Sequence, residues 1–236
     1  MGKVGNHSTT FQEIRSEQLT SSQQDCEGAQ GERTPAETSQ TTAIDSRPMI
    51  ESKLDGFILS VLGFTNAIIP SPDVALEELR RKFVDSEIQM MRADRIAGLE
   101  HLSFAAENAV RAVRQGRGRS KSVAMETLLF TSGQRQISKA IERLGVTPHT
   151  REVVITIFSR QSPSEDEANA RVQSVFEGKR SDAVIEIVSG KKIKELCRSF
   201  GISPEELAAA RLPSESVNSL VKRLILERSA LLSTGT

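Results

Sequence analysis

The sequence predicts an α/β protein in which a single compact domain follows a disordered tail. Residues 1–47 are rich in Ser, Thr, Gln, Glu and Gly, and such a polar segment cannot bury enough surface to offset the entropy of ordering. Residues 151–158 are dense in the β-branched side chains that favour strands. Other segments repeat apolar residues at the spacing of amphipathic helices. We therefore expect a tail over 1–47 and a domain over 48–236, with several helices covering a small mixed or antiparallel sheet.

The first predicted elements of the domain are two strands with a helix between them. The apolar run at residues 57–64 predicts a buried strand. Ser71 fits a helix N-cap, with Pro72 at the first helical position, and residues 87–94 predict the second strand. The inner face of the intervening helix would consist of Val74, Leu76, Leu79 and Phe83.

Three helices are expected next. The first covers residues 96–115 and ends at Gly116, because apolar side chains recur there at three-and-four spacing. The second begins at Ser122, and the third follows Gly133 and ends with Gly145 at its C-terminal cap. The buried side chains of the third helix would be Ile137, Ala140, Ile141 and Leu144.

The C-terminal part of the domain is predicted to be mainly helical. After the strand at 151–158, Ser164 and Glu167 form a capping box for a helix that runs to residue 175. Residues 182–188 alternate between apolar and polar and predict a further strand. The last three helices are predicted at residues 193–200, 204–210 and 217–232.

The formal net charge of zero hides a local imbalance. Residues 1–45 carry three basic and seven acidic side chains, whereas the stretch from Arg111 to Lys121 carries five basic residues and no acid. The two cysteines, Cys26 and Cys197, form no disulfide framework or metal spacing, which fits a reduced, intracellular protein. The start lacks the apolar run of a signal peptide, and no run approaches the roughly 20 apolar residues of a membrane helix. We expect a cytoplasmic protein.

Gly133 indicates an anion site. A glycine inside a helix costs roughly 1 kcal/mol relative to alanine, so its place between two helical segments predicts a helix break. The backbone N–H groups of Gln134, Arg135 and Gln136 would then be free at a new helix start, where the helix dipole favours negative charge. The guanidinium of Arg135 adds donors whose geometry matches phosphate. The alternative is a kink with a solvated Arg135.

The loop that carries Arg117, Arg119 and Lys121 is the second part of this predicted site. Such a loop can neutralise several phosphates of a polyanion, and it lies one helix before the break at Gly133, so we expect the two to face the same way. The alternative is an ordinary solvated loop. His101 is a third candidate for contact with a base or phosphate, although a lone histidine on a helix is more often a packing residue. The chain has no Trp or Tyr, so base stacking would fall to Phe or Arg.

The residues favour binding over catalysis. We identify no catalytic residues, because the sequence shows no nucleophile–base pair, Walker loop or dinucleotide fingerprint. The three histidines are too scattered for a metal site, and no cofactor is expected. The last helix has a broad apolar face that could contact a protein partner. The residues that we assign to that contact are Leu220, Leu224 and Leu231.

An alternative function rests on residues 193–210, which resemble a helix-turn-helix and would make the protein a DNA-binding regulator. The second helix, however, offers Glu205, Glu206 and alanines, where a recognition helix needs basic or amide side chains. We therefore interpret the segment as a structural turn.

Residues 94–146 resemble the PRPK-binding protein family, a subunit of the archaeal-type KEOPS complex. The motif residues that carry the resemblance are Ala97, Gly98, His101 and Leu102, followed by Ser122, Glu126, Leu128, Leu129, Phe130, Ser132, Gly133, Arg135, Gln136, Ile137, Ala140, Ile141 and Gly145.

This resemblance implies a compact α/β domain and a non-catalytic role. KEOPS makes threonylcarbamoyladenosine beside the anticodon of tRNAs that read codons beginning with A. The family member binds the small atypical kinase/ATPase subunit and, in archaeal-type complexes, the single-stranded 3′ CCA end of tRNA. The implied partners are thus the kinase/ATPase and tRNA, with no membrane or small-molecule substrate. The RNA-binding residues that we expect are His101, Arg117, Arg119, Lys121, Gly133, Gln134, Arg135 and Gln136.

Overall fold

The computed structural model describes residues 49–234, so the tail predicted at 1–47 lies outside the described residues. A five-stranded antiparallel sheet forms the centre of the domain, with the strand order β1-β2-β4-β3. The twelve-residue strand β2 (Phe57–Ile68) pairs on one side with β4 (Val153–Ser159). On its other side it pairs first with β1 (Ile50–Leu54) and then with β5 (Glu177–Arg180). The edge strand β3 spans Glu87–Arg92.

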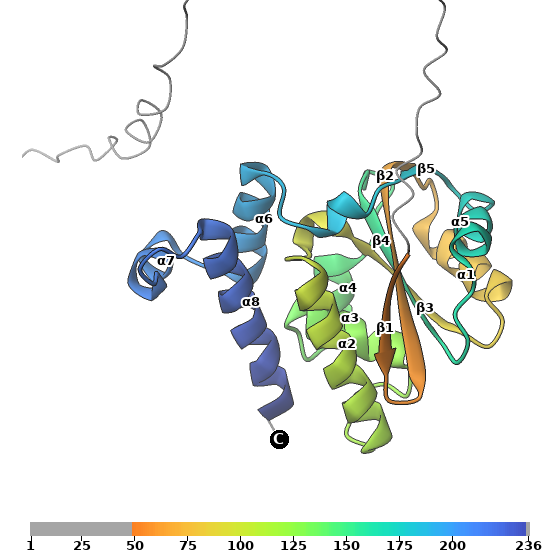
Figure 1. The fold of residues 1–236 in the computed structure, drawn as a ribbon, viewed down its shortest axis with the longest axis horizontal. Coiled ribbons are helices and arrows are strands. Elements are labelled where there is room, and N and C mark those ends of the chain that lie inside the picture. The colour runs from red at the N-terminus through yellow and green to blue at the C-terminus, as the bar shows by residue number, and fades with distance from the viewer. Residues whose placement is uncertain (1–48, 235–236) are drawn as a thin grey trace, which may run out of the picture. The chain divides into compact units, whose positions relative to one another are not determined.

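Helices cover both faces of this sheet (Figure 1). One face packs against α1 (Pro72–Lys82) and α5 (Glu165–Gln173), through a core that includes Phe64, Leu79 and Ile155. The other packs against α2 (Leu99–Arg114) and α3 (Val123–Ser132). All seven residues of β4 are buried, because both faces of this strand are covered.

A third layer lies outside α2 and α3. It contains α6 (Gly190–Phe200), α7 (Pro204–Ala210) and α8 (Val217–Thr234), which Figure 1 shows to one side of the sheet. A separate hydrophobic cluster that includes Leu196, Phe200 and Ile225 holds this layer together. The short helix α4 (Ile137–Leu144) follows α3.

The carboxylate of Glu186 connects the layers at the start of α2. It accepts a hydrogen bond from the backbone N–H of Leu99 at 2.9 Å and pairs with Lys222 of α8 at 2.7 Å. Gly98, just before the helix, has φ 112, and a Cβ there would lie 2.7 Å from the Glu186 carboxylate. The backbone conformation and the close approach therefore both require glycine at this position.

The predicted fold class is confirmed, but one predicted strand is wrong and two strands were not predicted. Residues 182–188 are not a strand, because Asp182–Ile185 forms a 3₁₀ helix. The Asp182 carboxylate accepts from the N–H of Gly63 in β2 at 2.8 Å, so a side chain occupies the backbone donor that a further strand would need at this position. The actual strand is β5, just before it, and β1 was not predicted at all.

Several side-chain predictions also need correction. Val74 is 56% exposed and is not on the inner face of α1, whereas Leu79 and Phe83 are buried as predicted. Ile137 and Ile141 of α4 are 38% and 48% exposed, because the core takes up only Ala140 and Leu144 of that helix's apolar stripe.

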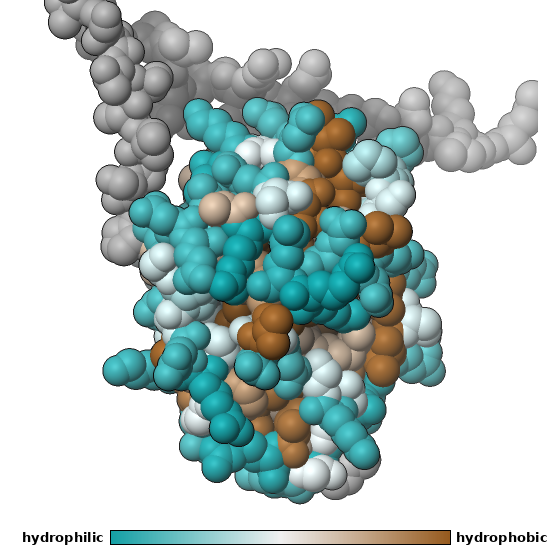
Figure 2. Space-filling view, turned by 90° about the vertical axis from the view of Figure 1, so that its right-hand side faces the viewer, coloured by the Kyte–Doolittle hydropathy of each residue, from teal (hydrophilic) through white to brown (hydrophobic). Residues whose placement is uncertain are grey.

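On the side of α1 and α5, the hydrophobic side chains at the surface do not gather into one large patch (Figure 2). Figure 2 shows that hydrophilic side chains predominate there, with hydrophobic ones between them, as is usual for a protein surface. None of the helices within residues 49–234 combines the length and the apolar character that crossing a membrane takes.

Candidate functional site

Gly133 ends α3 in the left-handed conformation, with φ 64. Its N–H donates to the carbonyl of Phe130 at 3.2 Å, and the N–H of Gln134 donates to the carbonyl of Leu129 at 3.2 Å. This pair of bonds is a Schellman motif, in which the residue after the helix favours glycine. The predicted helix break is therefore present. The N–H of Gln134, however, is used by α3 and is not free for an anion, and α4 begins only at Ile137, after the N-cap residue Gln136.

Arg135 is exposed beside this break and lines a hollow of about 300 Å³. Gly133 and Gln134 lie on one side of the hollow, and α8 contributes Arg228 and Leu231. The hollow thus joins the turn between α3 and α4 to the last helix of the domain.

Arg143 lines this hollow and contacts other residues that line it. Its guanidinium donates to the carbonyl of Ser132 at 2.8 Å and lies 5.4 Å from the centroid of the Phe200 ring. The amide of Gln134 faces the same guanidinium, 3.0 Å away when its oxygen is the atom turned toward it. Burial, followed by the charge of Arg95, lowers the pKa of Arg143, and the side chain still remains cationic at neutral pH.

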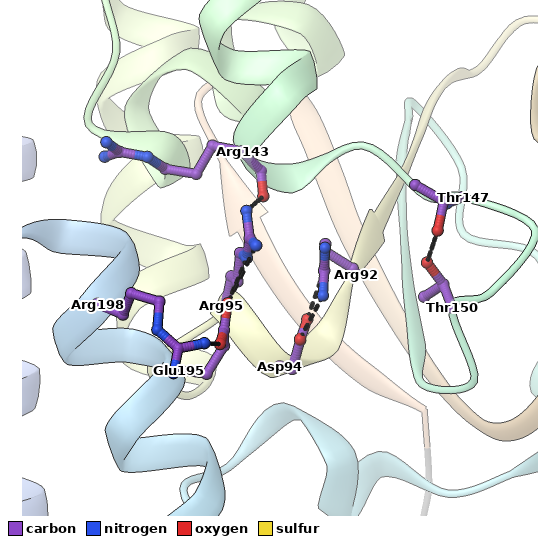
Figure 3. A network of polar contacts seen from close by, with 8 residues as sticks. All are labelled: Arg92, Asp94, Arg95, Arg143, Thr147, Thr150, Glu195 and Arg198. Carbon is purple, nitrogen blue, oxygen red and sulfur yellow. Dashed lines mark hydrogen bonds and ion pairs between the residues drawn. The ribbon is translucent and has the colours of Figure 1, made fainter.

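A chain of polar contacts connects α4 with α6 through Arg95 (Figure 3). Arg95 donates to the carbonyl of Arg143 at 2.6 Å and pairs with Glu195 at 3.0 Å. The other oxygen of Glu195 accepts from Arg198 at 2.9 Å. Arg95 and Glu195 are 21% and 18% exposed, so solvent and salt screen this ion pair less than they screen an exposed pair.

Three hollows join into one groove around these residues, which we call the basic groove. The hollow at Arg135 shares Gln134 and Arg143 with a second hollow of about 470 Å³. The second shares Glu195 and Arg198 with a third of about 580 Å³. The basic side chains that line the groove are Arg92, Arg95, Arg135, Lys139, Arg143, Arg151, Lys191, Lys192, Lys194, Arg198 and Arg228. The acidic ones are Asp94, Glu142, Glu152 and Glu195.

The acids of the groove leave most of this positive charge uncompensated. Asp94 is held by Arg92, whose pKa it raises through a hydrogen bond, and Glu195 is held by Arg95 and Arg198. Lys192 is 5% exposed and donates to the carbonyls of Val184 and Ile185, and burial lowers its pKa to about 8. Within the described residues, no ion pair involves Arg135, Lys139, Lys191 or Lys194.

The loop that carries Arg117, Arg119 and Lys121 does not belong to the groove. All three side chains are exposed, but the loop precedes α3 while Gly133 follows it. The ten residues of α3 separate the two by about 15 Å along the helix axis. The expectation that the loop and Arg135 face the same way is therefore wrong. The spacing in the sequence placed them one helix apart and did not show that they lie at opposite ends of that helix.

His101 lies inside the domain and is only 1% exposed, so it cannot touch an RNA at the surface in this structure. Its Nδ1 accepts from the N–H of Ala97 at 3.2 Å, and its Nε2 lies 3.4 Å from the hydroxyl of Ser229. Burial, followed by the charge of Lys192, lowers its pKa to about 3. The ring is therefore a neutral packing residue between α2, α6 and α8, in edge contact with Phe200.

Two of the three residues assigned to a protein partner are core residues. Leu220 and Leu224 are 2% and 4% exposed and belong to the cluster that holds the third layer. Leu231 is 65% exposed and lines the hollow at Arg135. The broad apolar face of α8 is wide because this helix packs on α2, α3 and α6 together.

Sequence reasoning missed Arg95, Arg143, Arg198 and the lysines of α6. Arg143 lies eight residues after Arg135, within the segment that carried the family resemblance, and this was the one available signal. The others join the site only through the packing of α6 against residues 93–95, which no local pattern shows.

The helix-turn-helix segment exists as α6 and α7, with the turn at Gly201. In α7, both oxygens of Glu206 accept from Arg228 at 2.8 Å, and Glu205 is exposed. This helix would thus present carboxylates to a DNA backbone, which is unfavourable. No group of three or more metal-binding side chains occurs among residues 49–234.

Comparison with known families gives a match over most of the described domain. Residues 73–233 match the family model described as kinase binding protein CGI-121. The matched region extends from α1 to α8 and includes the whole of the basic groove. Comparison with curated proteins gives no match.

The buried His101 predicts a dependence of stability on pH. Above pH 6.5 the ring is neutral in both the folded and the unfolded chain. Between about 6.5 and 3 only the unfolded chain takes up the proton, so stability is lost as the pH falls, by up to about 1.4 kcal/mol per unit. From pH 7 to 5 we expect this residue to reduce the free energy of unfolding by about 2 kcal/mol.

Urea unfolding of the wild type and of His101→Gln at both pH values measures this effect. The variant should lose less stability on acidification, while His149→Gln, at an exposed position, should behave as the wild type. An equal loss in the wild type and His101→Gln would show that His101 does not titrate in this way.

Proposed function

The chain belongs to the kinase binding protein CGI-121 family, and from this premise we propose that it is a non-catalytic subunit of a KEOPS-type complex. In this proposal it binds the atypical kinase/ATPase subunit and the 3′ CCA end of tRNA. Its role is to support threonylcarbamoyladenosine formation next to the anticodon. The family membership supports the kinase partner, and the basic groove supports the RNA.

The basic groove is the single observation that carries the RNA half of the proposal. It offers cations without carboxylate partners along a surface of connected hollows, which suits a flexible single strand better than a rigid duplex. Each hollow, at about 300 to 580 Å³, falls within the range of small-molecule pockets, and a nucleotide is a ligand of that size. Arg135 stands at one end of the groove, and Lys191 and Lys194 stand at the other, where they can neutralise phosphates.

Stacking surfaces for the bases are also present. The chain has no Trp or Tyr, so the planar guanidinium of Arg143 and the apolar side chain of Leu231 are the surfaces on which a base can pack. Arg143 is held in place by its bond to the Ser132 carbonyl and by its contact with Phe200, which reduces the entropy that it loses when a base stacks on it.

For the kinase half we propose the exposed edge of α4, in place of α8. Ile137 and Ile141 lie one helical turn apart and are both exposed, while Lys139, Glu142 and Arg143 of the same helix line the groove. Apolar side chains at this spacing form the kind of anchor that a partner protein buries. A kinase bound at this edge would lie beside the RNA end.

The proposed RNA site predicts that reversing the charge of Arg135 weakens the binding of tRNA. Arg135→Glu should weaken binding of tRNA with an intact CCA end by tenfold or more, because it removes a phosphate contact and adds repulsion. Trimming CCA should lower the affinity of the wild type to a similar level. Filter binding with both tRNAs measures this effect, and Arg80→Glu on α1, also exposed, is the matched control.

If Arg135→Glu binds intact tRNA as tightly as the wild type does, Arg135 is not part of the site. If trimming CCA changes nothing for the wild type, recognition of the 3′ end is itself wrong.

The kinase half predicts that Ile141→Asp releases the kinase/ATPase subunit while the chain stays folded, because Ile141 is 48% exposed. We expect a loss of affinity of at least tenfold, as for a central apolar anchor. Isothermal titration against the kinase/ATPase subunit measures this change, and circular dichroism checks the fold. Val84→Asp, at a residue that is 74% exposed on another surface, should bind as the wild type. Unchanged affinity of Ile141→Asp would rule out this edge of α4.

A further inference from the structure

The basic loop between α2 and α3 remains outside the proposed groove, and it forms a surface of its own. The turn of the β1–β2 hairpin lies against the end of α2, where Arg114 donates to the carbonyl of Asp55 at 3.2 Å and pairs with its carboxylate. A hollow of about 520 Å³ lies between this turn and the helix end. We call the surface around it the basic pole, and its cations are Lys53, Arg111, Arg114, Arg117, Arg119 and Lys121.

Two carboxylates, one buried and one partly buried, hold the loop in shape from the inside. Glu126 is 0% exposed and accepts from the backbone N–H of Ser120. Glu87 accepts from the hydroxyl of Ser122 at 2.6 Å and from the N–H of Ala124 at 3.1 Å. These acids therefore bind backbone and hydroxyl groups, and within residues 49–234 they form no ion pair with the arginines.

The start of the loop is also fixed by the end of α2. The N–H groups of Arg117 and Gly118 both donate to the carbonyl of Ala112, at 2.9 and 3.0 Å. The backbone is thus ordered before any ligand arrives, which lowers the entropic cost of binding.

The cations of the pole are exposed and mostly uncompensated. Of the six, only Arg114 forms an ion pair within residues 49–234, and Arg117 donates to the side-chain oxygen of Gln115. The exposed acids nearby are Asp55 and Glu107. Basic side chains therefore outnumber acidic ones on this surface of the domain, although the formal net charge of the whole chain is zero.

The composition of the pole favours a nucleic-acid backbone over an acidic protein. Between positions 114 and 121 it exposes Arg, Gln, Gly and Lys, with no apolar or aromatic anchor. A protein interface depends on such anchors, whereas contact with phosphates needs only cations and hydrogen-bond donors.

We propose that the basic pole is a second RNA-binding surface, which contacts the phosphates of a double-stranded stem independently of the 3′ end. The pole and the groove lie at opposite ends of α3, about 15 Å apart along its axis, so one tRNA can reach both. The biological assignment to tRNA rests on the proposed function. The affinity for an RNA duplex does not depend on it.

The test uses the full chain and a blunt-ended RNA duplex, which has no single-stranded 3′ end. The double variant Arg117→Gln/Arg119→Gln should bind this duplex at least tenfold more weakly at low salt. Its slope of log affinity against log salt should fall by about two, because two phosphate contacts are lost. The matched control is Arg80→Gln/Arg81→Gln, two exposed arginines of α1, which should bind as the wild type.

Unchanged duplex binding by the Arg117/Arg119 variant would overturn the proposal. So would a polyglutamate that binds as tightly as the duplex and loses affinity equally in this variant, because the surface would then serve an acidic protein segment.

A second measurement separates this proposal from the proposed function. The ratio of affinities for intact and CCA-trimmed tRNA should be unchanged in the Arg117/Arg119 variant, and its loss there would place the loop in the 3′-end site and overturn the independence of the pole. If Arg135→Glu instead leaves this ratio at its wild-type value while duplex binding still requires Arg117 and Arg119, the proposed groove fails and the pole stands.

Discussion

The ion pair between Arg95 and Glu195 is the interaction on which the basic groove depends. Arg95 lies in a three-residue 3₁₀ helix after β3, and from there it reaches both the carbonyl of Arg143 in the last turn of α4 and the carboxylate of Glu195 in α6. Three segments far apart in the sequence are thus held at one place by a single guanidinium. Hydrogen bonds to charged groups contribute about 1.5–3 kcal/mol each when they are shielded. These three segments line part of the groove. The turn after α3, helix α8 and residues 149–152 line the remainder.

Helix α4 gives the domain its functional arrangement. One side of this eight-residue helix lines the groove with Lys139 and Arg143, and its edge exposes Ile137 and Ile141. In the account proposed above, an RNA end and a kinase therefore meet across the width of one helix. The basic pole lies beyond the other end of α3, so the positive charge of the domain is divided between two separate surfaces.

Local signals in the sequence predicted the elements well where each element decides its own conformation. The bounds of α7, the end of α6 and the glycine break after α3 follow from caps and spacing that belong to those residues alone. Errors arose where contacts with residues far away in the sequence determine the conformation or the burial of a segment. The segment predicted as a strand at 182–188 begins with a 3₁₀ helix, where the Asp182 side chain binds the N–H of the distant Gly63. His101 is buried because the third layer covers it, and Leu224 is buried because it belongs to the hydrophobic cluster inside that layer. The groove itself could not be predicted, since α6 reaches Arg95 only in the folded chain.

The most direct test of the central claim is to locate the 3′ end of bound tRNA. A tRNA whose terminal adenosine carries a photo-cross-linking group would be irradiated with the full chain, and the attached peptides would be identified by mass spectrometry. The account predicts cross-links within residues 133–143 and 195–200, which line the groove. Cross-links confined to residues 117–121, or an equal yield from tRNA that lacks a single-stranded end, would contradict it.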